Sequence, residues 1–183
     1  PNLEALHLHN KQFCDISALA SLTQLKTLDL GWGSRCIRDI EPLSGLRNLD
    51  WLNLSGNNVS DLAPLANHPR LRELRINNNA IDAFSSLGLL NALTYLQADG
   101  NSLSSPSLEG FPQLRNLRLD STGISDLAPL VSTLVGPLEY LGLNDNAIAD
   151  FSPLNGLQNL RGIEAQNNNV RILSLRDLPK LNN

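Results

Sequence analysis

Apolar and polar positions along the chain repeat with a period of 21 to 24 residues. A leucine opens each unit, at Leu3, Leu25, Leu49, Leu71, Leu93, Leu114, Leu138 and Leu160. Because the period covers nearly every residue, it predicts eight stacked copies of one supersecondary unit around a continuous core. We therefore expect a single repeat domain over residues 1–183, as a piece of a longer protein.

The third unit illustrates the role of each position. Leu49, Leu52 and Leu54 follow an LxxLxL spacing, whose last part predicts a short strand with alternate side chains in the core. Stacked units then place these strands side by side in a parallel sheet. Asn57 follows where the chain must turn, and its amide can bond backbone groups that would otherwise stay unpaired. The same position recurs at Asn79, Asn101, Asn146 and Asn168, which predicts a structural asparagine ladder.

Aspartate recurs after the turn, two residues beyond an inward apolar position, at Asp15, Asp39, Asp61, Asp126 and Asp150. This placement is typical of side-chain caps on one-turn helices. A unit of about 22 residues has no room for a long helix beside its strand. We predict an α/β solenoid with a parallel β-sheet on the concave face, short 3₁₀ turns on the convex face and moderate curvature. Insertions around 33–36 and 131–136 should fall on turns or on the outer side.

The strings VSDLAPLA (59–66), ISDLAPL (124–130) and IADFSPL (148–154) carry a family resemblance. The chain resembles leucine-rich repeat proteins of the 22-residue class, and most closely the bacterial internalin-type repeats, whose pattern is LxxLxLxxNxIsDixPLxxL. Similar repeats occur in the regulatory subunit of protein phosphatase 1. Residues 1–183 include none of the helical cap, immunoglobulin-like domain or cell-wall sorting tail that accompany internalin repeats.

Outward side chains on the expected strands offer candidate binding residues. Three aromatic residues share one row on alternate strands, with about 10 Å between successive rings at the usual strand spacing. Arginines lie in the next column and aspartates two residues further on. Tryptophan, tyrosine and arginine are the usual anchors of protein interfaces. We predict a ligand-binding surface formed by Trp51, Arg75, Tyr95, Asp99, Arg118, Asp120 and Tyr140; alternatively, the rings only pack over the sheet edge.

Composition limits the classes of binding partner that the chain can have. The chain holds 40 leucines and 22 asparagines, with Lys+Arg 14, Asp+Glu 18 and a formal net charge of -4. This charge disfavours a nucleic-acid partner, which calls for a basic surface. The longest apolar run is only a few residues, far short of the roughly 20 that a transmembrane helix needs. We therefore expect no membrane insertion.

Chemistry-bearing residues are sparse. The 3 histidines and 2 cysteines form no recognisable nucleophile, zinc or phosphate-loop motif, so we expect no enzymatic activity, no cofactor and no metal. The one metal-like arrangement is His7 and His9 on one strand with Asp29 beside them, although outward histidines on a polar sheet are usually just solvated. His68 replaces an apolar framework position, and we interpret it as a turn residue.

Cys14 and Cys36 fall in adjacent units on the outgoing turn. Their positions are nearly but not fully equivalent, so a disulfide requires the insertion around 33–36 to bend inward. We favour the alternative of two small, partly buried thiols. Two cysteines alone leave the redox compartment open.

Two functions remain. The first is an extracellular or cell-surface recognition module that binds a protein or glycoprotein ligand on its concave sheet. This reading follows from the resemblance to internalin-type repeats and includes adhesion. The alternative is a cytoplasmic scaffold or regulatory subunit, similar to the phosphatase-binding repeats. Framework leucines near both ends should expose apolar surface, so weak self-association through these ends is a further expectation.

Overall fold

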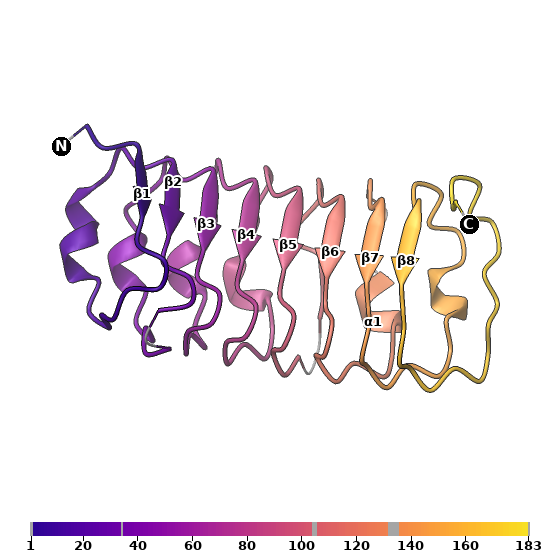
Figure 1. The fold of residues 1–183 in the computed structure, drawn as a ribbon. Coiled ribbons are helices and arrows are strands. Elements are labelled where there is room, and N and C mark those ends of the chain that lie inside the picture. The colour runs from indigo at the N-terminus through magenta and orange to yellow at the C-terminus, as the bar shows by residue number, and fades with distance from the viewer. Residues whose placement is uncertain (1, 34, 104–105, 132–135, 183) are drawn as a thin grey trace.

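The computed structural model describes residues 2–33, 35–103, 106–131 and 136–182. Eight short parallel strands form one sheet whose strand order follows the sequence (Figure 1). The strands are β1 (Ala5–His7), β2 (Thr27–Asp29), β3 (Trp51–Asn53), β4 (Glu73–Arg75), β5 (Tyr95–Gln97), β6 (Asn116–Arg118), β7 (Tyr140–Gly142) and β8 (Gly162–Glu164). The predicted leucine-rich solenoid is confirmed.

Strand register follows from burial of the framework leucines. The central apolar residue of each strand, a leucine in β1 to β7 and Ile163 in β8, pairs with that of the next, as in Leu28 with Leu52 and Leu52 with Leu74. These three side chains are fully buried. A slip of one residue would turn every framework side chain to the outer face of the sheet, so the apolar pattern specifies a single register. The rows of outward residues expected from the sequence are therefore confirmed.

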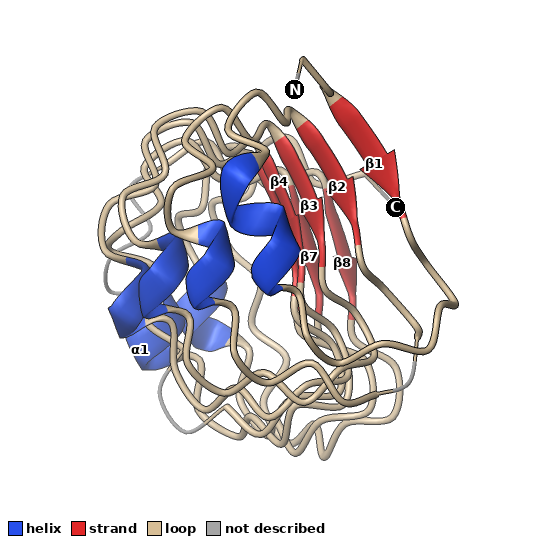
Figure 2. Ribbon diagram, turned by 90° about the vertical axis from the view of Figure 1, so that its left-hand side faces the viewer, coloured by secondary structure: helices blue, strands red, loops and turns tan. Residues whose placement is uncertain are grey.

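Short helices line the side of the solenoid that faces away from the sheet (Figure 2). Five are 3₁₀ helices: η1 (Ser17–Ser21), η2 (Glu41–Leu43), η3 (Ala63–Leu65), η4 (Ser85–Leu87) and η5 (Ser152–Leu154). The sixth unit instead has one α-helical turn, α1 (Ala128–Val131), in which the amide of Val131 donates to the carbonyl of Leu127 at 3.1 Å. Residues 132–135 of the insertion that follows lie outside the described residues.

The predicted aspartate caps are confirmed. The Asp61 carboxylate accepts the N–H of Ala63, the first residue of η3, at 2.8 Å. Equivalent bonds of 2.7 to 2.8 Å are made by Asp15, Asp39, Asp126 and Asp150. Each aspartate stands two residues before the amide that it accepts, and that amide has no partner inside so short a helix.

The asparagine ladder is also confirmed. Asn101 is buried, and its Nδ2 donates to the carbonyls of Ile76 at 3.0 Å and Ala98 at 2.9 Å. Its Oδ1 accepts the N–H of Ile81 at 3.0 Å. One side chain thus pairs backbone groups of two adjacent units, as a tight buried turn requires. In the sixth unit Thr122 takes this place and donates to the carbonyl of Leu119.

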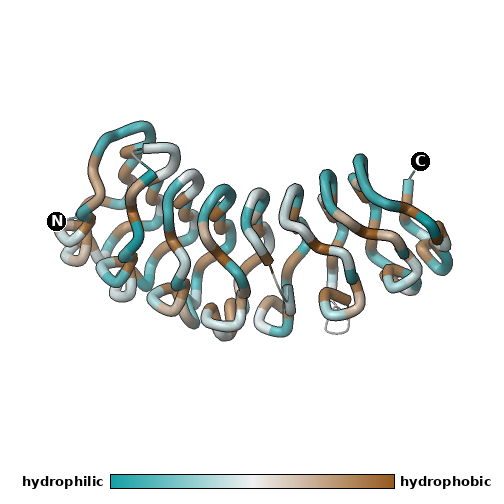
Figure 3. The backbone as a smooth tube through the Cα atoms, turned by 90° about the horizontal axis from the view of Figure 1, so that it is seen from below, coloured by the Kyte–Doolittle hydropathy of each residue, from teal (hydrophilic) through white to brown (hydrophobic). Residues whose placement is uncertain are grey.

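The stacked units follow a shallow arc with the sheet on its inner side (Figure 3). We call the outward face of the strands the concave surface. At the two ends of the stack, framework side chains lack one neighbour. Leu3 is 40% exposed and Leu173 is 73% exposed, which agrees with the apolar ends expected from the sequence. Among the described helices, none is long and apolar enough to cross a membrane.

Candidate functional site

The aromatic row, defined as Trp51, Tyr95 and Tyr140, lies on the concave surface as predicted. Strand pairing places Glu73 between the first two rings and Asn116 between the last two. Trp51 and Tyr95 are half-buried, whereas Tyr140 is 52% exposed. Burial raises the pKa of the Tyr95 phenol, so its hydroxyl stays neutral. The three rings therefore sit on separate strands, with one polar residue between each pair.

Arg75 joins the first two rings into one preassembled group. Its guanidinium carbon lies 5.5 Å from the centre of the Trp51 ring and 5.6 Å from that of Tyr95. Its Nε donates to the Glu73 carboxylate at 2.7 Å. Guanidinium–ring contacts at this distance are favourable, and the ion pair fixes the plane of the guanidinium. The structure thus brings together three of the predicted site residues: Trp51, Arg75 and Tyr95.

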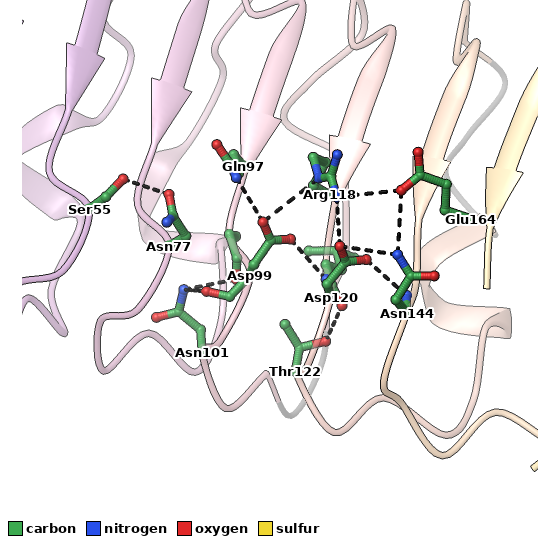
Figure 4. A network of polar contacts seen from close by, with 12 residues as sticks. Ser55, Asn77, Gln97, Asp99, Asn101, Arg118, Asp120, Thr122, Asn144 and Glu164 are labelled. Carbon is green, nitrogen blue, oxygen red and sulfur yellow. Dashed lines mark hydrogen bonds and ion pairs between the residues drawn. The ribbon is translucent and has the colours of Figure 1, made fainter. Parts of the chain in front are cut away.

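Arg118 instead turns toward the carboxyl ends of the strands, where acidic side chains surround it (Figure 4). Its Nη2 lies 2.8 Å from Asp120 and 3.5 Å from Glu164, and its Nε lies 3.8 Å from Asp99. The hydrogen bond that Arg118 donates to Asp120 is the largest cause of the raised pKa of Arg118. The predicted residues Asp99, Arg118 and Asp120 therefore form one network, which Glu164 joins.

The two aspartates also hold neighbouring strands together. Asp99 Oδ1 accepts the N–H of Asp120 at 2.9 Å, and Asp120 Oδ1 accepts the N–H of Asn144 at 2.8 Å. Asn144 continues the series by accepting the N–H of Gln166 at 2.8 Å. Figure 4 shows Asp99, Asp120 and Asn144 of this series side by side at the strand ends. The carboxylates of Asp99 and Asp120 therefore stabilise the fold by accepting backbone N–H groups of the next repeat. Sequence spacing did not indicate this structural role.

A hollow of about 380 Å³ opens on the concave surface over β6, β7 and β8, and Tyr95 also lines it. Its walls include Tyr140, Gly142, Gly162 and Glu164. The two glycines contribute no side chain to these walls. Pockets of this size suit a small group or one side chain rather than a whole protein segment.

Trp32 is an exposed aromatic residue that sequence reasoning overlooked. It is 43% exposed and adopts φ 57°. Equivalent positions in the other units share this left-handed conformation but carry Asn10, Gly56, Asn78, Gly100, Ser121, Asp145 and Asn167. A bulky residue in this conformation is uncommon and strained. The signal was present in the sequence, since tryptophan stands in a column of glycine and small polar residues.

Cys14 and Cys36 form a disulfide, with their Cα atoms 5.2 Å apart. The prediction of two thiols was wrong. The two cysteines are 22 residues apart, which is one repeat length, so they lie side by side on neighbouring coils despite the insertion. Residue 34 of that insertion lies outside the described residues.

The histidines form no metal centre in the described part of the chain, where no group of three or more suitable ligands occurs. His9 Nδ1 lies 3.4 Å from Asp29 Oδ2, while the other oxygen of Asp29 accepts from Asn53 at 2.8 Å. His68 follows η3 as a turn residue but is fully buried. Burial, followed by the nearby positive charge of Arg47, lowers the pKa of His68.

Comparison with known proteins agrees with this geometry. The family model described as leucine-rich repeats in 2 copies matches residues 47–88. Internalin C2 of Listeria monocytogenes superposes with a TM-score of 0.75 and 30% identity, over 90% of this chain and 71% of that one. A second internalin of this organism, InlF, superposes with a TM-score of 0.74 and 27% sequence identity, over 99% of this chain and 66% of that one. The chain belongs to the leucine-rich repeat proteins, with internalin-like repeats.

A curated relative shows that such repeats also occur within larger proteins. An adenylate cyclase of Schizosaccharomyces pombe is 32% identical over 170 residues, which is 87% of this chain and 10% of the relative. The chain thus spans a small part of that protein. Leucine-rich repeat domains in general bind proteins, and the repeat fold with its internalin-like neighbours is typically non-enzymatic.

Proposed function

We propose that this chain is a recognition module that binds a protein or glycoprotein ligand on its concave surface. The observation that carries the proposal is the preassembled group of Trp51, Arg75 and Tyr95, an aromatic and arginine cluster of the kind that anchors protein interfaces. Because Arg75 is already held by two rings and Glu73, little side-chain entropy is lost when a ligand covers it.

We further propose that the module acts outside the cell or at the cell surface, in recognition or adhesion. The Cys14–Cys36 disulfide supports this location, since disulfides persist in oxidising compartments and are rare in reducing ones. The structural likeness to internalins supports it as well. An intracellular scaffold uses the same face, but the disulfide argues against it.

The test is capture of partners from a cell-surface extract and a cytosolic extract by the immobilised module. A variant with Trp51→Ala, Tyr95→Ala and Tyr140→Ala is compared with the unchanged protein. Leu89→Ala is the control, since it removes an exposed apolar side chain, 48% exposed, outside the sheet. Thermal unfolding of each protein verifies that the fold survives.

We expect a surface protein to be retained by the unchanged module and by Leu89→Ala, and lost with the triple variant. Retention by all three proteins alike would show that the ligand uses another face. A cytosolic partner that depends on the same rings would support concave recognition but replace the surface role with that of a scaffold.

A further inference from the structure

Arg75 and Arg118 occupy equivalent places in the sheet. Arg75 is the last residue of β4, which lies between the strands carrying Trp51 and Tyr95. Arg118 is the last residue of β6, which lies between the strands carrying Tyr95 and Tyr140. Each arginine therefore stands between two rings that are two strands apart, or about 10 Å at the usual strand spacing.

The space between the rings of Trp51 and Tyr95, called the first gap, is filled by Arg75 of the chain itself. The Arg75 guanidinium lies 5.5 Å from one ring centre and 5.6 Å from the other, and Glu73 in the same gap accepts its Nε–H. The gap between Trp51 and Tyr95 therefore has the right width for one guanidinium. The contacts are those expected when a planar cation meets ring faces.

The space between the rings of Tyr95 and Tyr140, called the second gap, has no arginine stacked on its rings among the described residues. Arg118 is drawn away from the rings by Asp120 at 2.8 Å, with Glu164 and Asp99 further off. Within the described residues, both guanidinium–ring contacts belong to Arg75 and none to Arg118. The rings of Tyr95 and Tyr140 both line the hollow of about 380 Å³, which extends past Tyr140 to β8.

The polar network beside this hollow carries excess negative charge, while the lining itself holds one cation, Arg118, and one carboxylate, Glu164. Three carboxylates, those of Asp99, Asp120 and Glu164, face the single cation of Arg118, which leaves two excess negative charges. Glu164 is the least committed of the three. Its side chain is 61% exposed, and its contacts are long, at 3.4 Å to Asn144 and 3.5 Å to Arg118.

We propose that the gap between Tyr95 and Tyr140 binds an arginine side chain of the protein ligand, an inference that rests on the proposed function. The guanidinium stacks between the two rings, as Arg75 does in the first gap, and donates to Glu164. Arginine fits better than lysine because its planar group stacks on ring faces while its N–H groups point sideways to a carboxylate. Asn116 supplies a neutral acceptor where the first gap has Glu73.

The test uses N-acetyl-arginine amide as the probe, with N-acetyl-citrulline amide as its uncharged counterpart. Each is titrated into the ¹⁵N-labelled module while backbone amide signals are followed. We expect the arginine probe to shift the signals of Tyr95, Asn116, Tyr140 and Gly142, and the citrulline probe to shift them far less. Equal shifts with both probes, or shifts elsewhere alone, would overturn the proposal.

Variants locate the binding. Tyr140→Ala and Glu164→Gln should each lower the affinity for the arginine probe by about twofold to fivefold, the usual range for a single exposed ring or charge contact. Glu109→Gln makes the same charge change on an exposed residue away from the strands and should leave the affinity unchanged. An affinity unaffected by Tyr140→Ala would also overturn the proposal.

Trp51→Ala separates this inference from the proposed function, because it removes a ring of the first gap only. We expect it to lower capture of the protein ligand while leaving the arginine probe bound. If the probe fails to bind but capture still depends on the aromatic row, the arginine site is wrong and concave recognition stands. If the probe binds but capture ignores the row, the gap accepts a guanidinium while the protein ligand uses another face, so concave recognition is wrong and the ligand's arginine does not occupy this gap.

Discussion

The indole ring of Trp32 covers Gly56, the equivalent residue of the next repeat. A Cβ atom built on Gly56 would lie 2.4 Å from Cε3 of that ring. Gly56 also has φ 67°, where side chains other than glycine are strained. The exposed tryptophan and the glycine beneath it therefore depend on each other.

Gly56→Ala should consequently destabilise the protein more than its conformation alone explains. We expect the free energy of unfolding to fall by about 2–3 kcal/mol, from left-handed strain together with displacement of the ring. Gly123→Ala is the matched control, since Gly123 has φ 80° and nothing within 4 Å of the added atom. It should cost only about 1 kcal/mol. If urea unfolding showed the same loss of unfolding free energy for Gly56→Ala and Gly123→Ala, the ring would not rest on Gly56.

Asn101→Ala should break one step of the asparagine ladder. It removes four hydrogen bonds of the Asn101 side chain and leaves the carbonyls of Ile76 and Ala98 and the amide of Ile81 without that partner. Burial makes such a loss costly, so we expect about 3 kcal/mol less stability in urea unfolding. Asn91→Ala, on an exposed residue, is the control. A loss below about 1 kcal/mol for Asn101→Ala would show that water replaces the amide.

His68 should make stability depend on pH. Its pKa in the folded protein lies below the ordinary value of 6.5, because burial and Arg47 disfavour the charged form. The unfolded chain then binds the proton more readily, so stability is fully present above pH 6.5 and falls as the pH drops below it.

The comparison that isolates this effect is His68→Leu, which keeps an apolar side chain in the buried position and leaves the exposed His7 and His9 unchanged. Free energies of unfolding are measured from pH 8 to pH 5. The unchanged protein should lose stability over this range more steeply than the variant. Parallel curves would mean that His68 does not resist protonation in the folded state.

Loss of the Cys14–Cys36 disulfide should lower stability without altering the concave surface. The bridge closes a loop of 22 residues, for which the expected loss is about 3 kcal/mol. The double variant Cys14→Ser, Cys36→Ser should therefore melt at a lower temperature than the oxidised protein and at the same temperature as the reduced one. Alkylation under denaturing conditions gives a direct check, because two reactive thiols in the purified oxidised protein would contradict the disulfide.

The amino-acid sequence by itself determined the repeat, the sheet and its register. Framework leucines such as Leu52 and Leu74 can be buried in only one strand phase, so periodicity alone aligned Trp51, Tyr95 and Tyr140 in one row. Asp61 and Asn101 were equally predictable, because each satisfies backbone groups within one or two repeats. Local geometry and burial are properties that spacing along the chain encodes directly.

The tertiary structure alone decided where the outward side chains point. Arg75 and Arg118 occupy the same repeat position, yet one stacks between rings and the other pairs with Asp120. That difference depends on competition among residues from several strands, since ring faces and carboxylates attract the same guanidinium. The Cys14–Cys36 bridge likewise depended on how neighbouring coils align. Sequence spacing places a residue on a face, but contacts across strands select its conformation, its partners and the gap it leaves open.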